Sequence, residues 1–298
     1  MTQHKFNEIV NKKIFENNLT KLLEKIAEYP DRYVGLFRPT KPYAKIIQNI
    51  SQSYEIRFGD ALEAIFEEWF NYKGFENLPK KIKTKTDENL NIDLIFYSNK
   101  TNTIYMVEQK VRDDHDSTKK RGQYINFIKK YEIVEKLYKD KNITAIMWFV
   151  DDSLNKNKKY YESEIDKEIL QKNTDKIKIV YGEDFFNISD ELYKKSFWNE
   201  FIQMLEQWKV DIPNFPNVNF DDENNIQEVL KQISPTEVSN TVWKKLFEDD
   251  RITNEIFPVI FPNGLAFKTY IEIYDSNNLR DENTRNLMKR YIESIKKI

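Results

Sequence analysis

The stretch NIDLIFYSNKTNTIYMVEQKV, residues 91–111, contains two strand-like runs separated by a short polar segment. In the first run, 92–97, hydrophobic side chains recur at every second position, which is typical of a β-strand. The polar segment 98–102 predicts a turn, and the run at about 103–111 predicts a second strand. The stretch therefore predicts a β-hairpin.

The segments around this hairpin alternate between helical and strand patterns. The hydrophobic spacing predicts helices at about 5–29, 59–72, from 116 onward, at 161–171 and within 184–208, and further strands at 143–150 and 177–181. We expect Pro30 to end the first helix and Gly74 the second. The run at 143–150 is almost continuously apolar, as expected for a strand covered on both faces. This order predicts an α/β fold with a mixed central β-sheet flanked by helices.

The character of the sequence changes after residue 210. Pro213, Pro216 and the acidic patch 221–223 are typical of a connector. Beyond it we expect a mainly helical accessory region, 211–298, with a hairpin at about 257–274 and a final helix at about 283–297. The sequence thus predicts two domains, 1–210 and 211–298.

The composition narrows the functional classes. Of the 298 residues, 40% are hydrophobic, enough to build a substantial core. Cysteine is absent, which excludes disulfides, thiolate metal sites and a cysteine nucleophile, and only two histidines occur, His4 and His115. A net charge of −2 argues against a DNA-coating protein, although a local cleft can still be basic. We find neither a signal peptide nor a long apolar run, and therefore expect a cytoplasmic protein.

Two carboxylates and an ammonium group are expected to meet on the hairpin. Glu108 and Lys110 lie two positions apart on one strand and share a face, while Asp93 lies beside them on the neighbouring strand. Charges on an otherwise apolar sheet need compensation, which a divalent cation such as Mg²⁺ provides. Such an ion polarises a scissile phosphate and activates water, and Lys110 is placed to orient or deprotonate that water.

An aspartate, 14 intervening residues and then Glu-x-Lys on adjacent strands resembles the PD…(D/E)xK nuclease superfamily. Over about residues 55–185 the chain resembles a type II restriction endonuclease. The resemblance implies that Asp93 and Glu108 bind Mg²⁺ and that Lys110 is the catalytic lysine. It also implies an acidic metal ligand on the preceding helix, where Glu63 is the best match and Glu67 the alternative. Ile92 occupies the position of the motif's proline.

The resemblance also implies an activity and partners. The expected activity is Mg²⁺-dependent, sequence-specific hydrolysis of double-stranded DNA by a homodimer. A cognate DNA methyltransferase is expected in the same system, because a site-specific nuclease must spare its host's DNA. The accessory region 211–298 would then serve DNA recognition or dimerisation.

The segment after the second strand carries the candidate DNA-binding residues. Asp116 or Ser117 can cap the following helix, which leaves three cations in its first turn, where the helix dipole disfavours them unless a phosphate is bound. The alternative for these cations is a charged outer helix face, and for His115 a loop histidine bonded to a neighbouring Asp. The predicted DNA-binding residues are Arg112, His115, Ser117, Lys119, Lys120, Arg121 and Gln123.

Three other functions remain open at this point. One is a structure-specific repair or junction-resolving nuclease, which reads DNA shape. Another is a DNA-binding module whose catalytic site is silent, against which the intact Asp93, Glu108 and Lys110 argue. A paired-carboxylate glycosidase is the remotest, because Lys110 and the basic segment do not suit it. No phosphate loop of the GxxxxGK[ST] form occurs, so the sequence does not support ATP-driven cleavage.

Overall fold

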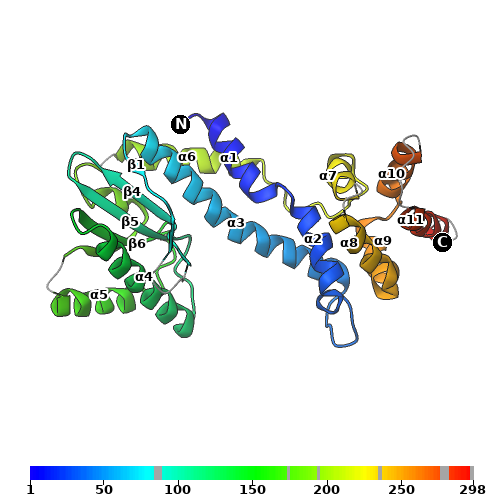
Figure 1. The fold of residues 1–298 in the computed structure, drawn as a ribbon, viewed down its shortest axis with the longest axis horizontal. Coiled ribbons are helices and arrows are strands. Elements are labelled where there is room, and N and C mark those ends of the chain that lie inside the picture. The colour runs from blue at the N-terminus through cyan, green and yellow to red at the C-terminus, as the bar shows by residue number, and fades with distance from the viewer. Residues whose placement is uncertain (84–88, 173–174, 193–194, 234–236, 276–281, 296–298) are drawn as a thin grey trace. The chain divides into compact units, whose positions relative to one another are not determined.

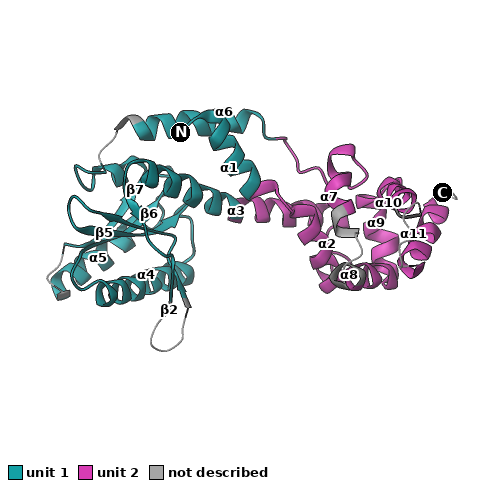
Figure 2. Cartoon of the chain, turned by 45° about the horizontal axis from the view of Figure 1, so that its top comes forward, with its two compact units in different colours: residues 1–13, 57–212 teal, residues 14–56, 213–298 magenta. Residues whose placement is uncertain are grey.

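The chain folds into two compact units in the computed structural model. The residues it describes are 1–83, 89–172, 175–192, 195–233, 237–275 and 282–295. One unit, which we call the sheet unit, contains Met1–Lys13 and Arg57–Ile212. The other, the helical unit, contains Ile14–Ile56 and Pro213–Ile298 (Figure 2).

The sheet unit is built on five strands in the order β1-β4-β5-β6-β7 (Figure 1). The first three pair antiparallel, and β5, β6 and β7 pair parallel, so the sheet is mixed as expected. The strands are β1 (Glu76–Asn77), β4 (Leu94–Ser98), β5 (Thr103–Lys110), β6 (Asn142–Phe149) and β7 (Ile177–Tyr181), beside a separate pair, β2 (Lys81–Lys83) and β3 (Asn89–Asn91). The predicted hairpin is the β4–β5 pair, in which Leu94 lies opposite Val107 and Ser98 opposite Thr103.

Helices cover both faces of this sheet. On one face, α4 (Ser117–Leu137) and α5 (Lys158–Lys172) pack against alternate side chains of β4 to β7. On the other face, aromatic rings of α3 (Pro42–Tyr72), the 3₁₀ segment η2 (Gly182–Asn187) and α6 (Lys195–Val210) meet those of the strands. The Phe70 ring stacks on Phe96, and the Trp148 ring stacks on Phe185. Burial from both sides explains the apolar run of β6.

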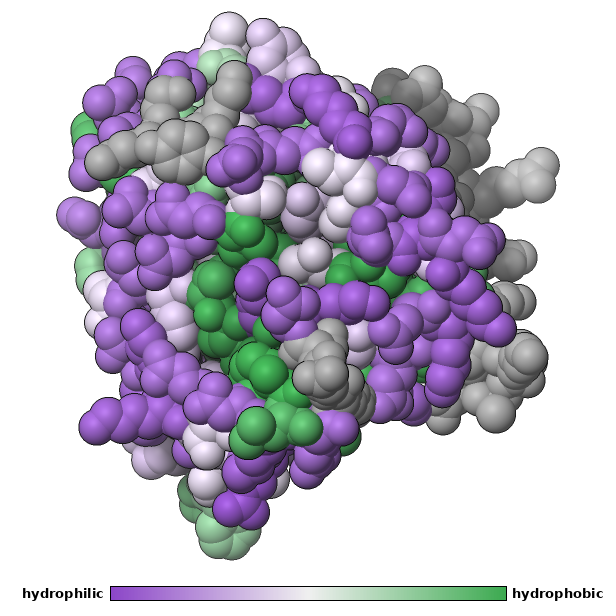
Figure 3. Space-filling model, turned by 90° about the vertical axis from the view of Figure 1, so that its left-hand side faces the viewer, coloured by the Kyte–Doolittle hydropathy of each residue, from purple (hydrophilic) through white to green (hydrophobic). Residues whose placement is uncertain are grey.

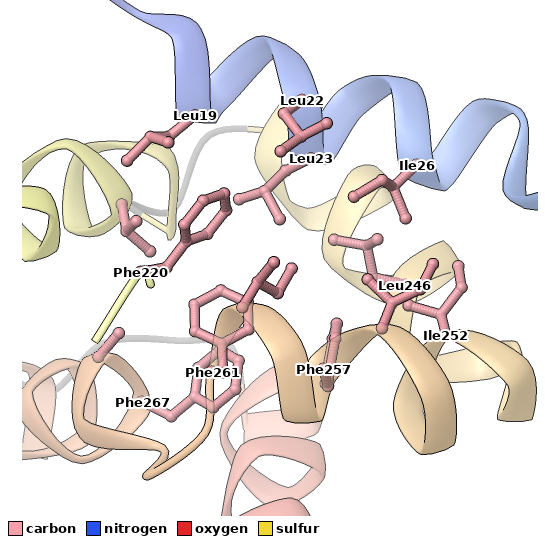
Figure 4. Packing of buried hydrophobic residues seen from close by; sticks show 14 of the residues in the cluster. Leu19, Leu22, Leu23, Ile26, Phe220, Leu246, Ile252, Phe257, Phe261 and Phe267 are labelled. Atoms are coloured by element: carbon pink, nitrogen blue, oxygen red, sulfur yellow. The ribbon is translucent and has the colours of Figure 1, made fainter. Parts of the chain in front are cut away.

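The helical unit has a core of its own. Its elements are α2 (Asn18–Glu28), the 3₁₀ turn η1 (Pro30–Arg32), the first part of α3, α7 (Glu223–Ile233), α8 (Glu237–Glu248), the π-helical turn η3 (Ile252–Ile256), α9 (Phe257–Ile260), α10 (Leu265–Asp275) and α11 (Glu282–Ile295). Leucine and isoleucine side chains of α2 point toward Phe220, Phe257 and Phe261 (Figure 4). The hairpin expected at 257–274 is wrong, because these residues form α9 and α10, whose rings pack on helical neighbours.

Two helix boundaries differ from the expectation. The single helix expected at 5–29 is divided into α1 (Gln3–Phe15) and α2, because Asn17 adopts a left-handed conformation with φ 58°. Asparagine tolerates this conformation better than most residues. The helix expected at 59–72 begins earlier, at Pro42, whose fixed φ suits a first helical turn. It ends at Tyr72 before Gly74, which has φ 86°.

The grouping of residues also differs from the division expected at residue 210. The second part of the chain does leave the sheet unit close to that point, after Ile212. However, Ile14–Ile56 group with the C-terminal residues, because the apolar side of α2 packs on α7 and α8.

The surface is mostly hydrophilic, as a content of 32% charged residues leads one to expect. On the side shown in Figure 3, hydrophobic residues are visible in a central area bordered by hydrophilic ones. Among the residues that the structure describes, no helix is both long and apolar enough to cross a membrane.

Candidate active site

The β4–β5 hairpin brings the three predicted catalytic residues together. Asp93 lies in the bend between β3 and β4, and Glu108 and Lys110 lie at the end of β5. The backbone N–H of Gln109 donates a hydrogen bond to Asp93 Oδ2 over 2.9 Å. This bond fixes the Asp93 carboxylate next to the Glu-x-Lys sequence.

Three oxygen atoms converge on the Lys110 ammonium group. Lys110 Nζ lies 3.2 Å from Asp93 Oδ2 and 2.9 Å from Glu108 Oε1. It also donates to the backbone carbonyl of Gln109 over 3.0 Å. Two carboxylates and one carbonyl oxygen therefore surround the Lys110 ammonium group, and all three come from the hairpin or from the bend directly before it.

A second lysine, on α4, completes the charge balance. Lys130 Nζ lies 2.5 Å from Glu108 Oε2, and both side chains are buried. The sequence analysis missed Lys130. A signal was present, because Lys130 shares its helical face with Phe127 and Val134, both of which pack against the sheet. A lysine in such an apolar stripe must be buried beside a carboxylate.

Burial changes the proton affinity of the cluster. The pKa of Asp93 is raised, first because burial disfavours the carboxylate and second because Glu108 is also negative; Lys110 acts in the opposite direction. Burial by itself lowers the pKa of Lys110, but attraction to Glu108 and Asp93 outweighs it and the pKa is raised. Lys110 therefore remains an ammonium group that donates hydrogen bonds.

The acidic residues of α3 lie close to this cluster but bind another cation. Glu63 Oε2 lies 2.9 Å from Lys80 Nζ, and Glu67 Oε2 lies 3.7 Å from the same nitrogen. Burial raises the pKa of Glu63, the hydrogen bond from Lys80 lowers it, and Asp93 is near enough to raise it again. Across the described ranges, no three Asp, Glu, His or Cys side chains are grouped closely enough to hold a metal ion.

The hairpin atoms nevertheless suit a hard divalent cation. Mg²⁺ is commonly bound by one or two carboxylates, with waters and substrate phosphate oxygens completing its coordination. Asp93 and Glu108 supply two carboxylates that already face one cation, and the Gln109 carbonyl adds a third oxygen. The donor set therefore fits Mg²⁺ bound mainly through these two side chains.

A buried aspartate holds the segment that leads from β5 to α4. Asp113 is fully buried and accepts hydrogen bonds from the backbone and side-chain nitrogens of Asn157, over 2.7 and 2.8 Å, and from Tyr181 Oη over 3.0 Å. Sequence reasoning missed Asp113, because its partners lie 44 and 68 residues away. Its role is to fix the path of the candidate DNA-binding segment.

The predicted DNA-binding residues divide into three groups. Ser117, Lys119 and Arg121 are exposed on the first turns of α4, and Arg112 and His115 are half-buried before it. Lys120 and Gln123 already have protein partners, because Lys120 donates to Asn157 Oδ1 over 3.1 Å and Gln123 Oε1 accepts from Tyr161 Oη over 3.2 Å. The exposed group is therefore the more accessible to a phosphate backbone.

His115 was expected either to contact DNA or to be a loop histidine bonded to a neighbouring Asp, and both roles stay predictions. Its Nδ1 lies 3.6 Å from Asp114 Oδ1, and its backbone carbonyl accepts a hydrogen bond from Asn157. Burial lowers the pKa of His115, and the positive charge of Lys119 lowers it further. The neutral imidazole is therefore favoured, which can donate or accept a hydrogen bond.

Asp116 is the cap of α4. Its Oδ1 accepts from the backbone N–H groups of Thr118 and Lys119, over 3.0 and 2.8 Å. The hydrogen bond from Lys119 lowers the pKa of Asp116 in the folded protein, so its stabilising contribution is present at neutral pH and is lost as the pH falls through that lowered value.

We expect Asp116→Ala to loosen the start of α4, because two backbone N–H groups lose their acceptor. Hydrogen exchange at Thr118 and Lys119 should accelerate at pH 7, whereas Asp116→Ser, which keeps a capping oxygen, should remain near the wild type. If acidification lowers the protection factors, which correct for the intrinsic pH dependence of exchange, equally in wild type and Asp116→Ala, the assigned cap is wrong.

The fold and this cluster together define a class. A mixed five-stranded sheet flanked by helices, carrying two carboxylates and a lysine on its hairpin, is the restriction-endonuclease-like α/β fold. Residues 70–209 match the family model described as "Type II restriction endonuclease, HinfI". This match supports a type II restriction endonuclease, a site-specific deoxyribonuclease.

The matched region lies within the sheet unit and contains Asp93, Glu108 and Lys110. No curated protein and no solved structure matches the chain.

Proposed function

We propose that the chain is a Mg²⁺-dependent endonuclease that cuts both strands of duplex DNA at a specific sequence, with its chemistry centred on Asp93, Glu108 and Lys110. The observation that supports this most directly is the convergence of Asp93, Glu108 and the Gln109 carbonyl on one cationic position. A bound Mg²⁺ ion would polarise the scissile phosphate and lower the pKa of the attacking water.

The chain's own residues have separable roles in this proposal. Asp93 and Glu108 would hold the ion, which would have to displace Lys110 Nζ from between them, and the Gln109 N–H keeps Asp93 in place. Lys110, which keeps its proton, orients the water by hydrogen bonding and offsets the negative charge that develops on the phosphate. Glu63 would have to release Lys80 to reach an ion, so its role as a metal ligand stays a prediction.

DNA contact is proposed for the segment that Asp113 and Asp116 fix. Ser117, Lys119 and Arg121 face solvent and are placed for phosphate contacts, with Arg112, His115, Lys120 and Gln123 as further candidates. Phosphate contacts of this kind set the register of an enzyme on DNA, and base contacts then read the sequence.

The wider system is also part of the proposal. A homodimer would place two active sites on the two strands of a symmetric target. A cognate DNA methyltransferase would protect the host's own sites. A cytoplasmic location stays a prediction.

The first experiment is incubation of the purified protein with a long DNA of known sequence. Discrete fragments that require Mg²⁺ and disappear with EDTA are the expected result. A random smear would indicate a non-specific nuclease, and preferential cleavage of branched DNA over linear duplex would support the junction-resolving alternative instead. Fragments formed equally well in EDTA would contradict the metal dependence.

Lys130 is proposed as a positioning residue that acts through Glu108. We expect Lys130→Met to lower cleavage about 10- to 100-fold, in the range typical for partners of metal ligands. The Mg²⁺ concentration for half-maximal rate should rise, because one oxygen of Glu108 loses the ammonium group that orients it.

The matched control for this variant is Lys136→Met, an exposed lysine on the same helix, which should leave both quantities unchanged. A merely structural role for Lys130 would lower the amount of folded protein without moving the Mg²⁺ dependence.

A further inference from the structure

A tight turn in the helical unit carries two hydrophobic side chains at its apex. The backbone N–H of Arg38 donates to the carbonyl of Gly35 over 3.1 Å, which places Leu36 and Phe37 at the two central positions of the turn. Leu36 is 92% exposed and Phe37 is 96% exposed. These are the most exposed of the large hydrophobic side chains in the described part of the chain, the next reaching 82%.

The apex is unusual for its position. The central residues of turns are normally Gly, Pro, Asn, Asp or Ser, which suit the backbone and contact water at little cost. Single exposed hydrophobic residues need no explanation, but an adjacent leucine and phenylalanine exposed together mark a surface that binds a partner.

The turn is held rigidly at its base. Tyr33 and Val34 are buried in the core of the helical unit immediately before it, and Pro42 begins α3 four residues after Arg38. Arg38 Nε donates to the Asp31 carbonyl over 3.0 Å, and Gly35 has φ 142°, a conformation that favours glycine. A preformed turn loses little conformational entropy when it binds.

The charge around the apex is uniformly positive along the sequence. Between Asp31 and Glu55 no acidic residue occurs, whereas Arg32, Arg38, Lys41 and Lys45 are cationic, in a chain whose net charge is −2. Arg32, Arg38 and Lys41 are exposed. Such a segment attracts a polyanion.

A buried hydroxyl group lies at the base of the turn. Tyr33 lines a hollow of about 180 Å³ together with Arg38, Lys41 and Glu255. The Tyr33 side chain is buried, and its hydroxyl has no hydrogen-bond partner in the described part of the protein. A buried hydroxyl group without a partner is costly.

We propose that this turn is a DNA-binding wedge in which Leu36 and Phe37 contact base faces at one step of the duplex and Arg38 and Lys41 contact the flanking phosphates. Proteins that deform DNA insert apolar side chains between base steps in this way, and basic residues hold the backbone on each side. The inference rests on the proposed function, because it takes duplex DNA as the substrate. The positive charge favours DNA over an apolar partner.

The test measures DNA binding in EDTA, so that no cleavage occurs. The full-length wild type is compared with the double variant Leu36→Ala/Phe37→Ala, with Phe37→Trp, and with Leu170→Ala, an 82% exposed leucine of α5 that serves as the matched control. The duplex contains a mapped cleavage site, or random sequence if none is found, with 2-aminopurine placed at successive positions.

We expect the double variant to bind about 10- to 100-fold more weakly, since an aromatic contact with a base is worth that much in affinity. The wild type should raise 2-aminopurine fluorescence at one step, the double variant should not, and Phe37→Trp should restore it. Leu170→Ala should behave like the wild type.

The outcomes separate this inference from the proposed function. If wild type and double variant bind equally and neither raises the fluorescence, the wedge is refuted while DNA cleavage stands. If the wild type binds no duplex at all, both fail. Binding of anionic vesicles that depends on Leu36 and Phe37, or conversion of a dimer to a monomer by the double variant, with DNA binding unchanged, would also overturn the proposal.

Discussion

Glu108→Gln is expected to reduce the rate of DNA cleavage by about a thousandfold or more, the scale of losses seen when a residue that stabilises the transition state is removed. Glutamine has the same shape, but its one amide oxygen can accept from only one of Lys110 and Lys130, because its amide nitrogen is a donor. It lacks the negative charge, so the paired carboxylates that face one cation become a single carboxylate. The rate should be measured in single turnovers at saturating Mg²⁺.

The control for this variant is Glu162→Gln, an exposed residue of α5, which should cut at the wild-type rate. Binding of duplex DNA in EDTA should survive in Glu108→Gln, because the change removes a negative charge from the site. Cleavage by Glu108→Gln within a few-fold of the wild type would mean that the hairpin cluster is not the catalytic site.

Trp148→Ala should destabilise the sheet unit by about 3–5 kcal/mol, the usual cost of emptying a large buried aromatic position. Trp148 is completely buried on β6. Its ring stacks on Phe185 at 4.2 Å and meets Phe66 edge-on at 4.5 Å, and its Nε1 donates to the Gly182 carbonyl over 2.9 Å. Alanine removes these contacts and leaves the carbonyl without its donor.

Hydrogen exchange of peptides from β6 is the suitable measurement, because a chain with two units need not unfold in one step. Protection in β6 should fall by more than about a hundredfold, since each tenfold corresponds to about 1.4 kcal/mol. Protection of α8 and α10 in the helical unit should change little. For Trp148→Phe, which keeps a ring but loses the hydrogen bond, protection in β6 should lie between that of the wild type and that of Trp148→Ala. Equal loss of protection in both units would contradict the independence of their cores.

The elements that sequence reasoning predicted are those whose signals are local. The β4–β5 hairpin follows from alternation within about twenty residues, and the same alternation places Glu108 and Lys110 on one face. The mixed sheet was confirmed for the same reason, and of the two residues expected to cap α4, Asp116 and Ser117, the cap is Asp116. Asp93 was also found beside Lys110, because a short hairpin leaves few ways to pair two strands.

The features that sequence reasoning missed depend on distant partners. Lys130 reaches Glu108 across 22 residues, and Asp113 reaches Tyr181 across 68. The sequence identifies neither partner, although the place of Lys130 on the apolar face of α4 signals that its side chain is buried. The assignment of 14–56 to the helical unit was missed for a related reason, because the amphipathic pattern of α2 shows that a face is buried but does not show against which helices.

The interrupted course of the helical unit has a consequence for biosynthesis. Its two pieces, Ile14–Ile56 and Pro213–Ile298, are separated by the greater part of the sheet unit. As a ribosome extends the chain from the N-terminus, all sheet strands emerge before Phe257 and Phe261, on which Leu23 and its neighbours depend for cover. The nascent polypeptide must therefore expose the hydrophobic side of α2 until Phe257 and Phe261 have been synthesised, and during that interval we expect a chaperone to bind it.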